Sequence, residues 1–325
     1  MSASKTWIDG NGMHIDDEGL LQNMKRVTAS ATLVEAYLNG CPAKYLFSSK
    51  LQDKIFPEGP DSPLKRGEAF HRVMELYYGI DESERGSTLN DHVLNMCARK
   101  AVGEMPAEFE KSRAFRLWLR NTMDDYIDMD GQYTNVHVAK YKEGHKYKPG
   151  LELSVSGYIG DASLRTYGKI DRLTDDGEGG VFIDDYKTGK KAKHYDPRDR
   201  FPEFDYVRQQ TMYAMLLEKD AEEANSGLRI NCARLLFPIP NKVVTVDVND
   251  RKIRRKTMDD VKKASDMLGD AVESNTYALS PGKLCSWCPL VNICPKADRD
   301  DRDKFVAARA KQPDAEFLKT VVAKG

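Results

Sequence analysis

The chain has 325 residues, of which 40% are hydrophobic and 31% are charged, so it is long enough to bury a core and too ordinary in composition for a disordered protein. Fifty lysines and arginines against 51 aspartates and glutamates give a net charge of -1, which excludes binding of polyanions through bulk charge. Any nucleic-acid site must therefore depend on local basic patches or on metal ions.

Membrane and secretory signals are absent from the sequence. No apolar stretch approaches the roughly 18 residues of a membrane helix, and the first 19 residues are polar and acidic, unlike a signal peptide. We therefore expect a cytoplasmic protein with no membrane partner. Six cysteines are too few for a disulfide scaffold, and a reducing compartment would leave their thiolates available for metal.

The N-terminal half predicts mainly helices. Residues 1–20 lack periodicity and predict a leader or a loosely ordered edge. Hydroxyl residues followed by apolar residues at helical spacing predict a helix over 30–38, which ends just before Cys41. A second apolar pattern of helical period carries His71. The stretch that follows is charged and mostly helical, and we expect it to form an insertion over about 79–150.

The second half of the chain changes period. Alternating apolar and polar residues predict strands over 151–156, 164–173 and 181–187, and the glycine-rich segment between the last two predicts an antiparallel hairpin. Further elements are expected to follow: a helix over 204–217, strands over 230–237 and 242–248, and a helix over 249–273. This order predicts an α/β fold in which helices flank a mixed sheet.

Acidic residues and a lysine gather around the predicted hairpin. Because side chains alternate along a strand, Asp185 and Lys187 project to one face and Asp184 to the other. A turn near residues 177–178 sets Asp171 opposite Asp185, within about 5 Å. Two carboxylates at that distance repel each other unless a cation lies between them, and carboxylates that hold Mg²⁺ or Mn²⁺ serve to hydrolyse phosphodiesters. Lys187 would orient water or neutralise developing charge; the alternative is a surface hairpin with ordinary ion pairs.

Three cysteines lie close together near the C-terminus, at positions 285, 288 and 294. Cys41 is the best candidate for a fourth ligand, because proline follows it as proline follows Cys288 and Cys294. Four thiolates suit zinc or an iron-sulfur cluster, and the spacing does not decide between them. Either would join the two ends of the chain, whereas the alternative is a set of unrelated buried cysteines.

Together these residues resemble the PD-(D/E)XK nuclease superfamily. Within it they resemble the RecB-like exonucleases that carry a four-cysteine iron-sulfur cluster, including the CRISPR-associated RecB-like enzymes and the AddB nuclease domain. The resemblance covers about residues 30–295. The motifs that carry it are Gly67-x-x-x-His71, Gly168-x-x-Asp171, Asp185-x-Lys187, Gln209-x-x-x-Tyr213 and the cysteines Cys41, Cys285, Cys288 and Cys294.

The resemblance implies a restriction-endonuclease-like domain over 21–297, with a C-terminal tail over 298–325. It further implies that the four cysteines hold a [4Fe-4S] cluster, with zinc as the alternative, that clasps the N- and C-terminal segments together. It assigns metal ligation to His71, Asp171 and Asp185, catalysis to these residues and Lys187, and substrate binding to Gln209 and Tyr213.

The function implied by the resemblance is a Mg²⁺- or Mn²⁺-dependent DNA exonuclease. It would act on single-stranded DNA or DNA ends in recombination, repair, or CRISPR or viral DNA processing, with partner proteins from those pathways. The alternative is a catalytically idle DNA-binding or recombination-partner protein with the same fold. The basic runs over 187–193 and 251–256 are candidate phosphate contacts.

Overall fold

The structure of the protein is a computed structural model. It describes residues 6–48, 59–86, 89–133, 137–143, 146–190, 192, 204–224, 226–282, 285–288, 290–309 and 321–323. The chain divides into two compact units. The first unit consists of Met1–Pro57, Tyr158–Thr166 and Met258–Gly325, and the second consists of Glu58–Gly157 and Tyr167–Thr257.

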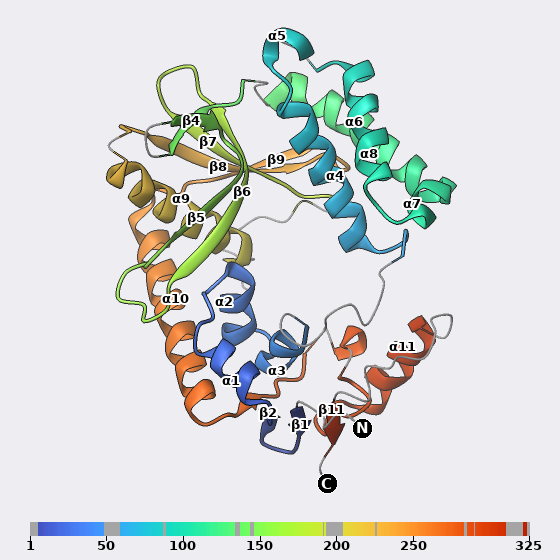
Figure 1. The fold of residues 1–325 in the computed structure, drawn as a ribbon, viewed down its shortest axis with the longest axis vertical. Coiled ribbons are helices and arrows are strands. Elements are labelled where there is room, and N and C mark those ends of the chain that lie inside the picture. Colours follow the sequence, from blue (N-terminus) through green and yellow to red (C-terminus); the bar gives the residue numbers. More distant parts are fainter. Residues whose placement is uncertain are drawn as a thin grey trace. The chain divides into compact units, whose positions relative to one another are not determined.

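A five-stranded mixed sheet organises the second unit (Figure 1). Its strands follow one another in the order β5 (Leu151–Gly157), β6 (Thr166–Asp175), β7 (Val181–Tyr186), β8 (Ile230–Phe237) and β9 (Lys242–Val246). Strands β7 and β8 run parallel, whereas β6 with β7 and β8 with β9 run antiparallel. The predicted mixed sheet and the predicted antiparallel hairpin are therefore confirmed.

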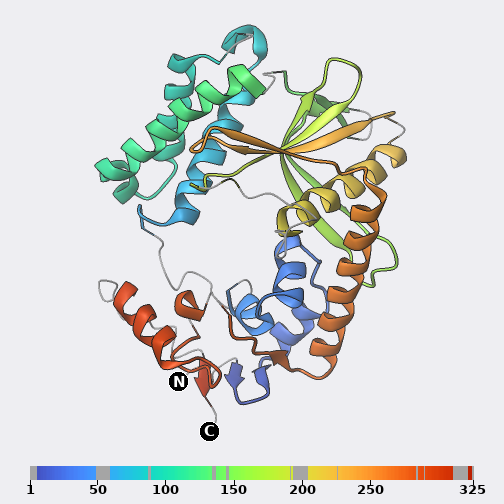
Figure 2. The same cartoon turned by 180° about the vertical axis from the view of Figure 1, so that it is seen from behind.

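Helices cover this sheet. Helix α9 (Phe204–Glu223) packs against β5 and β8, as the view from behind also shows (Figure 2). Helix α4 (Pro63–Tyr78) and the long α8 (Arg113–Tyr133) are joined to the sheet by an aromatic cluster. In that cluster the rings of Phe70, Tyr126 and Tyr186 meet edge to face, with centroids 5.8–5.9 Å apart.

The predicted insertion is helical only in its first part. Its helices are α5 (Glu82–Arg85), α6 (Asp91–Gly103), α7 (Ala107–Lys111) and α8. Two segments near its end instead form a separate two-stranded hairpin, from β3 (Lys140–Glu143) and β4 (Lys146–Pro149). The expectation of a helical insertion over 79–150 is thus wrong for these two strands.

The first unit contains a small four-stranded sheet in the order β10 (Tyr277–Ala278), β2 (Gly12–Ile15), β1 (Thr6–Ile8) and β11 (Val321–Ala323). Ile8, Met13 and Ile15 are at most 3% exposed. The expected loosely ordered leader is therefore wrong for residues 6–15, and part of the expected tail pairs with them through β11.

The remaining elements of the first unit are helical. They are α1 (Glu18–Met24), α2 (Ala31–Leu38), α3 (Pro42–Leu46), the 3-10 turn η2 (Cys285–Trp287) and α11 (Arg299–Arg309); α10 (Arg251–Glu273) starts in the second unit. Helix α2 starts at Ser30, whose hydroxyl accepts from Leu33 N–H at 3.2 Å. Within the described ranges, none of the helices combines the length and apolar character needed to traverse a bilayer.

Candidate active site

The β6–β7 hairpin sets the spacing of the acidic residues. Its turn is held by the Asp176 carboxylate, which accepts two backbone N–H groups at 2.8 and 2.7 Å. Arg172 pairs with Asp184 in the register, so the next positions away from the turn are Asp171 and Asp185. The two carboxyl-bearing positions thus lie next to each other at one end of the hairpin.

His71 lies on α4, as the helical pattern predicted. Its Nε2 is 3.0 Å from the Tyr186 carbonyl oxygen, and because a carbonyl only accepts, this nitrogen donates its N–H. The other ring nitrogen, Nδ1, then faces Asp171 Oδ1 at 3.3 Å. Burial lowers the pKa of His71, but the Asp171 carboxylate raises it more, to about 9. The surroundings of Nδ1 therefore favour positive charge.

Asp185 and Lys187 form a close pair beside them. Asp185 is 5% exposed, and its Oδ2 lies 2.6 Å from Lys187 Nζ, although no described group meets this oxygen in hydrogen-bond geometry. Burial raises the pKa of Asp185, and nearby Asp171 raises it further against the opposing effect of Lys187. Burial lowers the pKa of Lys187, but Asp185 raises it, to about 12. One lysine therefore faces more negative charge than it can balance.

Glu152 is an additional acidic residue that the sequence motifs did not single out. One ligand atom each from His71, Glu152 and Asp171 lie within 4.8 Å of one another. Glu152 adopts a φ of 48°, a left-handed conformation that costs a residue with a side chain about 1–2 kcal/mol. Its carboxylate pairs closely with Lys169, and burial followed by the nearby Asp171 charge raises its pKa while Lys169 lowers it.

Gln209 and Tyr213 lie on one face of α9 and connect to the lysine. Gln209 Nε2 donates to the Tyr213 hydroxyl at 2.9 Å, and Lys187 Nζ donates to Gln209 Oε1 at 3.4 Å. Tyr213 is only 8% exposed, because its ring packs directly on Gly168 of β6. A Cβ at that glycine would approach the ring carbons to 2.4 Å, so this position requires glycine.

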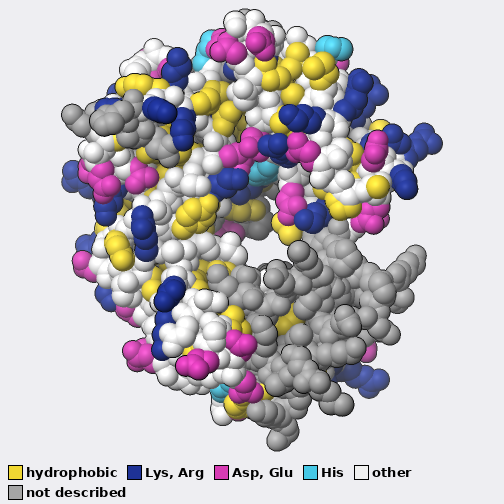
Figure 3. All heavy atoms as spheres, in the orientation of Figure 1, with side chains coloured by type: hydrophobic (Ala, Val, Ile, Leu, Met, Phe, Trp, Pro, Cys, Tyr) yellow, Lys and Arg dark blue, Asp and Glu magenta, His cyan; other side chains and the backbone are white. Residues whose placement is uncertain are grey.

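Several of these side chains border one cavity of about 690 Å³ in the second unit. His71, Glu152, Asp171 and Lys187 line it, and Leu64 and Tyr206 contribute apolar surface. Figure 3 shows acidic, basic and histidine side chains gathered on the face beside α4. The cavity is large enough to admit a substrate of nucleotide size and has its charged groups concentrated in one place.

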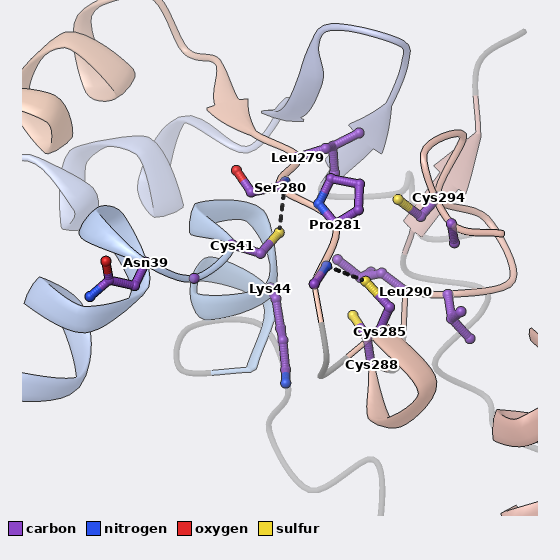
Figure 4. A pocket seen from close by; sticks show the side chains of 14 residues that line it. Asn39, Cys41, Lys44, Leu279, Ser280, Pro281, Cys285, Cys288, Leu290 and Cys294 are labelled. Carbon is purple, nitrogen blue, oxygen red and sulfur yellow. Dashed lines mark hydrogen bonds between the residues drawn. The ribbon is translucent and has the colours of Figure 1, made fainter. Parts of the chain in front are cut away.

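The four predicted cysteine ligands lie together in the first unit. They line a cavity of about 400 Å³, and their sulfurs point into it (Figure 4). Cys41 comes from the start of α3, and the other three come from the segment around η2, so the cavity joins segments that are more than 240 residues apart in sequence. No three of these sulfurs, all in described residues, lie within 4.8 Å of one another.

Backbone N–H groups point at two of these sulfurs. Ser280 N lies 3.5 Å from Cys41 Sγ, and Gly282 N lies 3.2 Å from Cys285 Sγ. Such bonds favour thiolates that ligate a metal. Burial raises the pKa of Cys288 to about 12 and also raises that of Cys294, so both would remain protonated unless a cation offset the burial.

The model of the PD-(D/E)XK nuclease superfamily matches residues 28–295. The chain belongs to this superfamily. That membership and the mixed sheet flanked by helices confirm the predicted restriction-endonuclease-like α/β fold. Nucleases of the superfamily generally use divalent metals.

Two solved structures are similar to the chain at low identity. One is a Eubacterium rectale protein provisionally described as an exonuclease, with 10% identity, a TM-score of 0.45 and coverage of 90% of this chain and 96% of that chain. The other is the protein SSO0001, with 11% identity, a TM-score of 0.31 and coverage of 71% of this chain and 84% of that chain. No curated protein sequence matches the chain significantly.

The residues around the hairpin fit a divalent cation. His71 donates its Nε2–H to a backbone carbonyl, which leaves Nδ1 as the nitrogen that faces the carboxylates, as in most histidines that bind metal. The raised pKa of His71 and the buried Asp185 carboxylate, whose Oδ2 faces Lys187 Nζ, both show that these positions favour positive charge. Imidazole nitrogen and carboxylate oxygens together form a donor set that can hold a divalent cation.

Proposed function

We propose that the protein is a metal-dependent deoxyribonuclease that acts as an exonuclease on single-stranded DNA or DNA ends. The observation that carries this proposal is the grouping of His71, Asp171 and Lys187 around one cavity, with Asp185 2.6 Å from Lys187, in a chain of the PD-(D/E)XK nuclease superfamily. Phosphodiester hydrolysis needs a charged, preorganised site of this kind. DNA is the proposed partner.

His71 Nδ1, Asp171 and Asp185 are the proposed ligands of Mg²⁺ or Mn²⁺, and we add Glu152 to them. When bound, the cation would polarise the scissile phosphate and promote hydrolysis by water. The Tyr186 amide donates to Asp171 Oδ2 at 2.8 Å, which fixes that carboxylate and leaves Oδ1 directed at His71. Glu152, on the neighbouring strand β5, places a carboxylate oxygen within 4.8 Å of ligand atoms of His71 and Asp171.

Lys187 is the proposed catalytic cation. Its raised pKa keeps the ammonium group protonated at neutral pH, so it stabilises negative charge that develops on the phosphate and does not act as a general base. Gln209 holds it by accepting from Nζ, and Tyr213 holds Gln209 in turn. We therefore propose that Gln209 and Tyr213 support DNA binding by positioning Lys187, since Tyr213 is itself buried.

The proposed role of the cysteines is to hold a [4Fe-4S] cluster that fastens the segment around η2 to α3. Zinc with thiolates about 2.3 Å away brings its four sulfurs to roughly 3.8 Å from one another. The sulfurs here are spread more widely, and the cavity they line has a volume of about 400 Å³. Both features favour a cluster over a single zinc ion.

Digestion of labelled DNA tests the enzymatic proposal. Single- and double-stranded oligonucleotides, labelled at either end, are incubated with Mg²⁺ or Mn²⁺, and with EDTA as the metal-free reference. We expect the unaltered protein to shorten the DNA stepwise from one end. Asp185→Asn and Lys187→Ala should each abolish this shortening. Asp259→Asn, the same chemical change at an exposed position on α10, should digest like the unaltered protein.

Two results would contradict this proposal. Unaltered digestion by Asp185→Asn and Lys187→Ala would assign the activity to a contaminant. Binding of DNA by the unaltered protein without any hydrolysis, over a range of both metals, would instead favour the idle DNA-binding alternative.

Anaerobic purification tests the cluster. We expect brown protein with absorbance near 400 nm, roughly where thiolate-to-iron charge transfer lies, together with iron and sulfide. Cys285→Ser should lose the colour, whereas Cys232→Ser should keep it, because Cys232 lies on β8 of the second unit and does not line the cysteine cavity. Colourless protein with stoichiometric zinc would overturn the iron-sulfur assignment.

A further inference from the structure

The β3–β4 hairpin carries a concentration of basic and aromatic side chains that the candidate active site does not use. Its described residues include four lysines and one glutamate, in a protein whose overall charge is -1. All of β4 is exposed, and Tyr147 at its centre is 66% exposed. Lys and Arg side chains are visible over β4 in Figure 3. An exposed aromatic ring among lysines offers both a stacking surface and positive charge to a ligand.

The register of the hairpin places lysines beside this tyrosine. Lys142 pairs with Tyr147 and Lys140 pairs with Pro149, so Lys140 and Lys142 share the tyrosine's face. Lys142 Nζ donates to the Ala224 carbonyl oxygen at 3.0 Å, which leaves Lys140 as the exposed lysine of that face. Lys146 precedes the ring on the same strand and projects from the opposite face.

The hairpin is anchored firmly enough to serve as a platform. Tyr141, on the opposite face of β3, is only 7% exposed. At the base of the hairpin, Gly150 N donates to the Ala139 carbonyl oxygen at 2.8 Å, and Ala139 N donates to the Leu173 carbonyl oxygen at 2.9 Å. An isolated two-stranded hairpin is marginal in water, so these attachments to β6 fix its position.

The anchor also sets the distance from the candidate active site. Leu173 follows Asp171 by two residues on β6, which is about 7 Å of strand. Tyr147 lies three residues from the base of the hairpin, so it stands within roughly 20 Å of the carboxylates by strand geometry. A few nucleotides of an extended strand can cover that separation.

We propose that the β3–β4 hairpin binds single-stranded nucleic acid outside the active site, with Tyr147 stacking on a base and Lys140 and Lys146 contacting phosphates. This inference deepens the proposed nuclease function and rests on it for the choice of DNA. An aromatic platform with flanking cations is the usual means of holding single strands without sequence preference, because every base has a face to stack on. A purely acidic partner would need the lysines but not the exposed ring.

The other basic run that we considered, over 251–256, fits this task less well. Its Arg254 is held in a close ion pair by Glu218 and also donates to the Val248 carbonyl oxygen at 3.3 Å. No exposed aromatic side chain accompanies it among the described large hydrophobic residues of the same helix. The run over 187–193 extends outside the described residues.

Fluorescence anisotropy with a labelled 30-nucleotide oligo-dT strand tests the inference on the full-length protein in EDTA. We expect Tyr147→Ala to weaken binding about 30-fold, the middle of the range for one stacked base, and Tyr147→Phe to bind normally. The matched control is Tyr158→Ala, because Tyr158 is 55% exposed but has no neighbouring lysine in the sequence. Circular dichroism confirms that each variant is folded.

Two further measurements separate stacking from charge. On a strand of abasic residues, Tyr147→Ala should bind like the unaltered protein. Replacing Lys140 or Lys146 with alanine should reduce the slope of log affinity against log salt by about 0.7 for each phosphate that the lysine no longer neutralises. Lys263→Ala, at an exposed position on α10, should leave the slope unchanged.

Affinity of Tyr147→Ala for oligo-dT within twofold of the unaltered protein would overturn the inference, as would an equal loss on the abasic strand. Polyglutamate binding as tight as oligo-dT binding would show an acidic protein partner instead. Because anisotropy is measured without metal, its outcome is independent of turnover. Failure of the proposed function shows separately, as the absence of metal-dependent cleavage by the unaltered protein.

Discussion

Two adjacent aspartates on β7 are both buried, yet they have different charged partners on the two faces of the strand. Asp184 accepts hydrogen bonds from Arg172 and Arg234, at distances between 2.6 and 3.0 Å, and also from Thr174. Burial raises the pKa of Asp184, but the two arginines lower it more. Asp185, on the other face, has one lysine and a second carboxylate nearby, and its pKa is raised.

The difference shows how one strand can supply both stability and chemistry. On the face of Asp184, Arg172 also donates to the Tyr126 hydroxyl and lies over the Tyr78 ring, so its charge is enclosed by partners. On the face of Asp185, the carboxylates of Asp171 and Asp185 lie beside His71 and Lys187, and burial leaves the pKa of Asp185 raised. In a structural network the carboxylate is neutralised by arginines of the protein itself. In a metal site the carboxylates are fully neutralised only when the ion binds.

The largest effect we expect is the loss of stability in Asp184→Ala. This change leaves Arg172 and Arg234 buried without their carboxylate, and breaking a buried pair in this way costs about 3–5 kcal/mol. Urea denaturation in EDTA measures the free energy of unfolding. Asp185→Ala is the matched control and should change that free energy by less than about 1 kcal/mol, because the Asp171 carboxylate remains near Lys187 to offset its charge. Equal losses in both variants would remove the distinction between the two faces.

The next effect concerns activity. Lys187→Met removes the cation on the face of β7 that carries Asp185. We expect the rate of metal-dependent DNA cleavage to fall by about 100- to 1,000-fold, as when one preorganised charge-stabilising group is removed. Single-turnover cleavage at saturating protein measures this rate. Lys263→Met, at an exposed position on α10 outside the basic runs, should keep the rate within a factor of about three. An unchanged rate in Lys187→Met would show that the lysine has only a structural role.

A smaller effect should follow from Gly168→Ala, which tests whether Tyr213 and Gln209 position Lys187. The added Cβ would overlap the Tyr213 ring, and overpacking of this kind costs about 1–3 kcal/mol. The displaced ring should also disturb Gln209 and slow cleavage. Gly157→Ala on β5 is the control, since its Cβ would meet Leu216 at an ordinary 3.4 Å. Comparison of urea midpoints for the two variants decides the point, and equal midpoints would contradict it.

The sequence predicted the hairpin side of the site because its determinants are local. Alternation along 181–187 and the glycine-rich turn define which side chains share a face, and the structure has that register. Glu152 escaped prediction because its contribution depends on a left-handed backbone angle and on the pairing of β5 with a distant part of the site. A charged residue between Leu151 and Leu153 in a predicted strand was the available signal.

The N-terminal strands escaped prediction for a related reason. Strands β1 and β2 have only three and four residues, too few to display a period of two. One partner of β1 is β11, more than 300 residues later, and one partner of β2 is β10. Pairing over such distances depends on the complete fold and leaves no local pattern in the sequence.

The smallest effect we expect is a pH dependence of the free energy of unfolding, caused by titration of His71. Folding raises the pKa of His71 from 6.5 to about 9, so the contribution of its ion pair with Asp171 is fully present below pH 6.5 and is lost as the pH rises through 9. Because about a third of the side chain is exposed, we expect a fall of only about 1 kcal/mol in the free energy of unfolding. Urea denaturation in EDTA at pH 6 and pH 9.5 measures it.

His71→Gln should abolish that fall, whereas His92→Gln, at an exposed position on α6, should retain it. Manganese should abolish it too in the unaltered protein, because a cation bound to Nδ1 takes the place of the proton there. The manganese result links the titration to the proposed ligand set, since Asp184 on the opposite face keeps its arginines at either pH. A fall that persists in His71→Gln would place the titrating group elsewhere and break the contrast between the two faces.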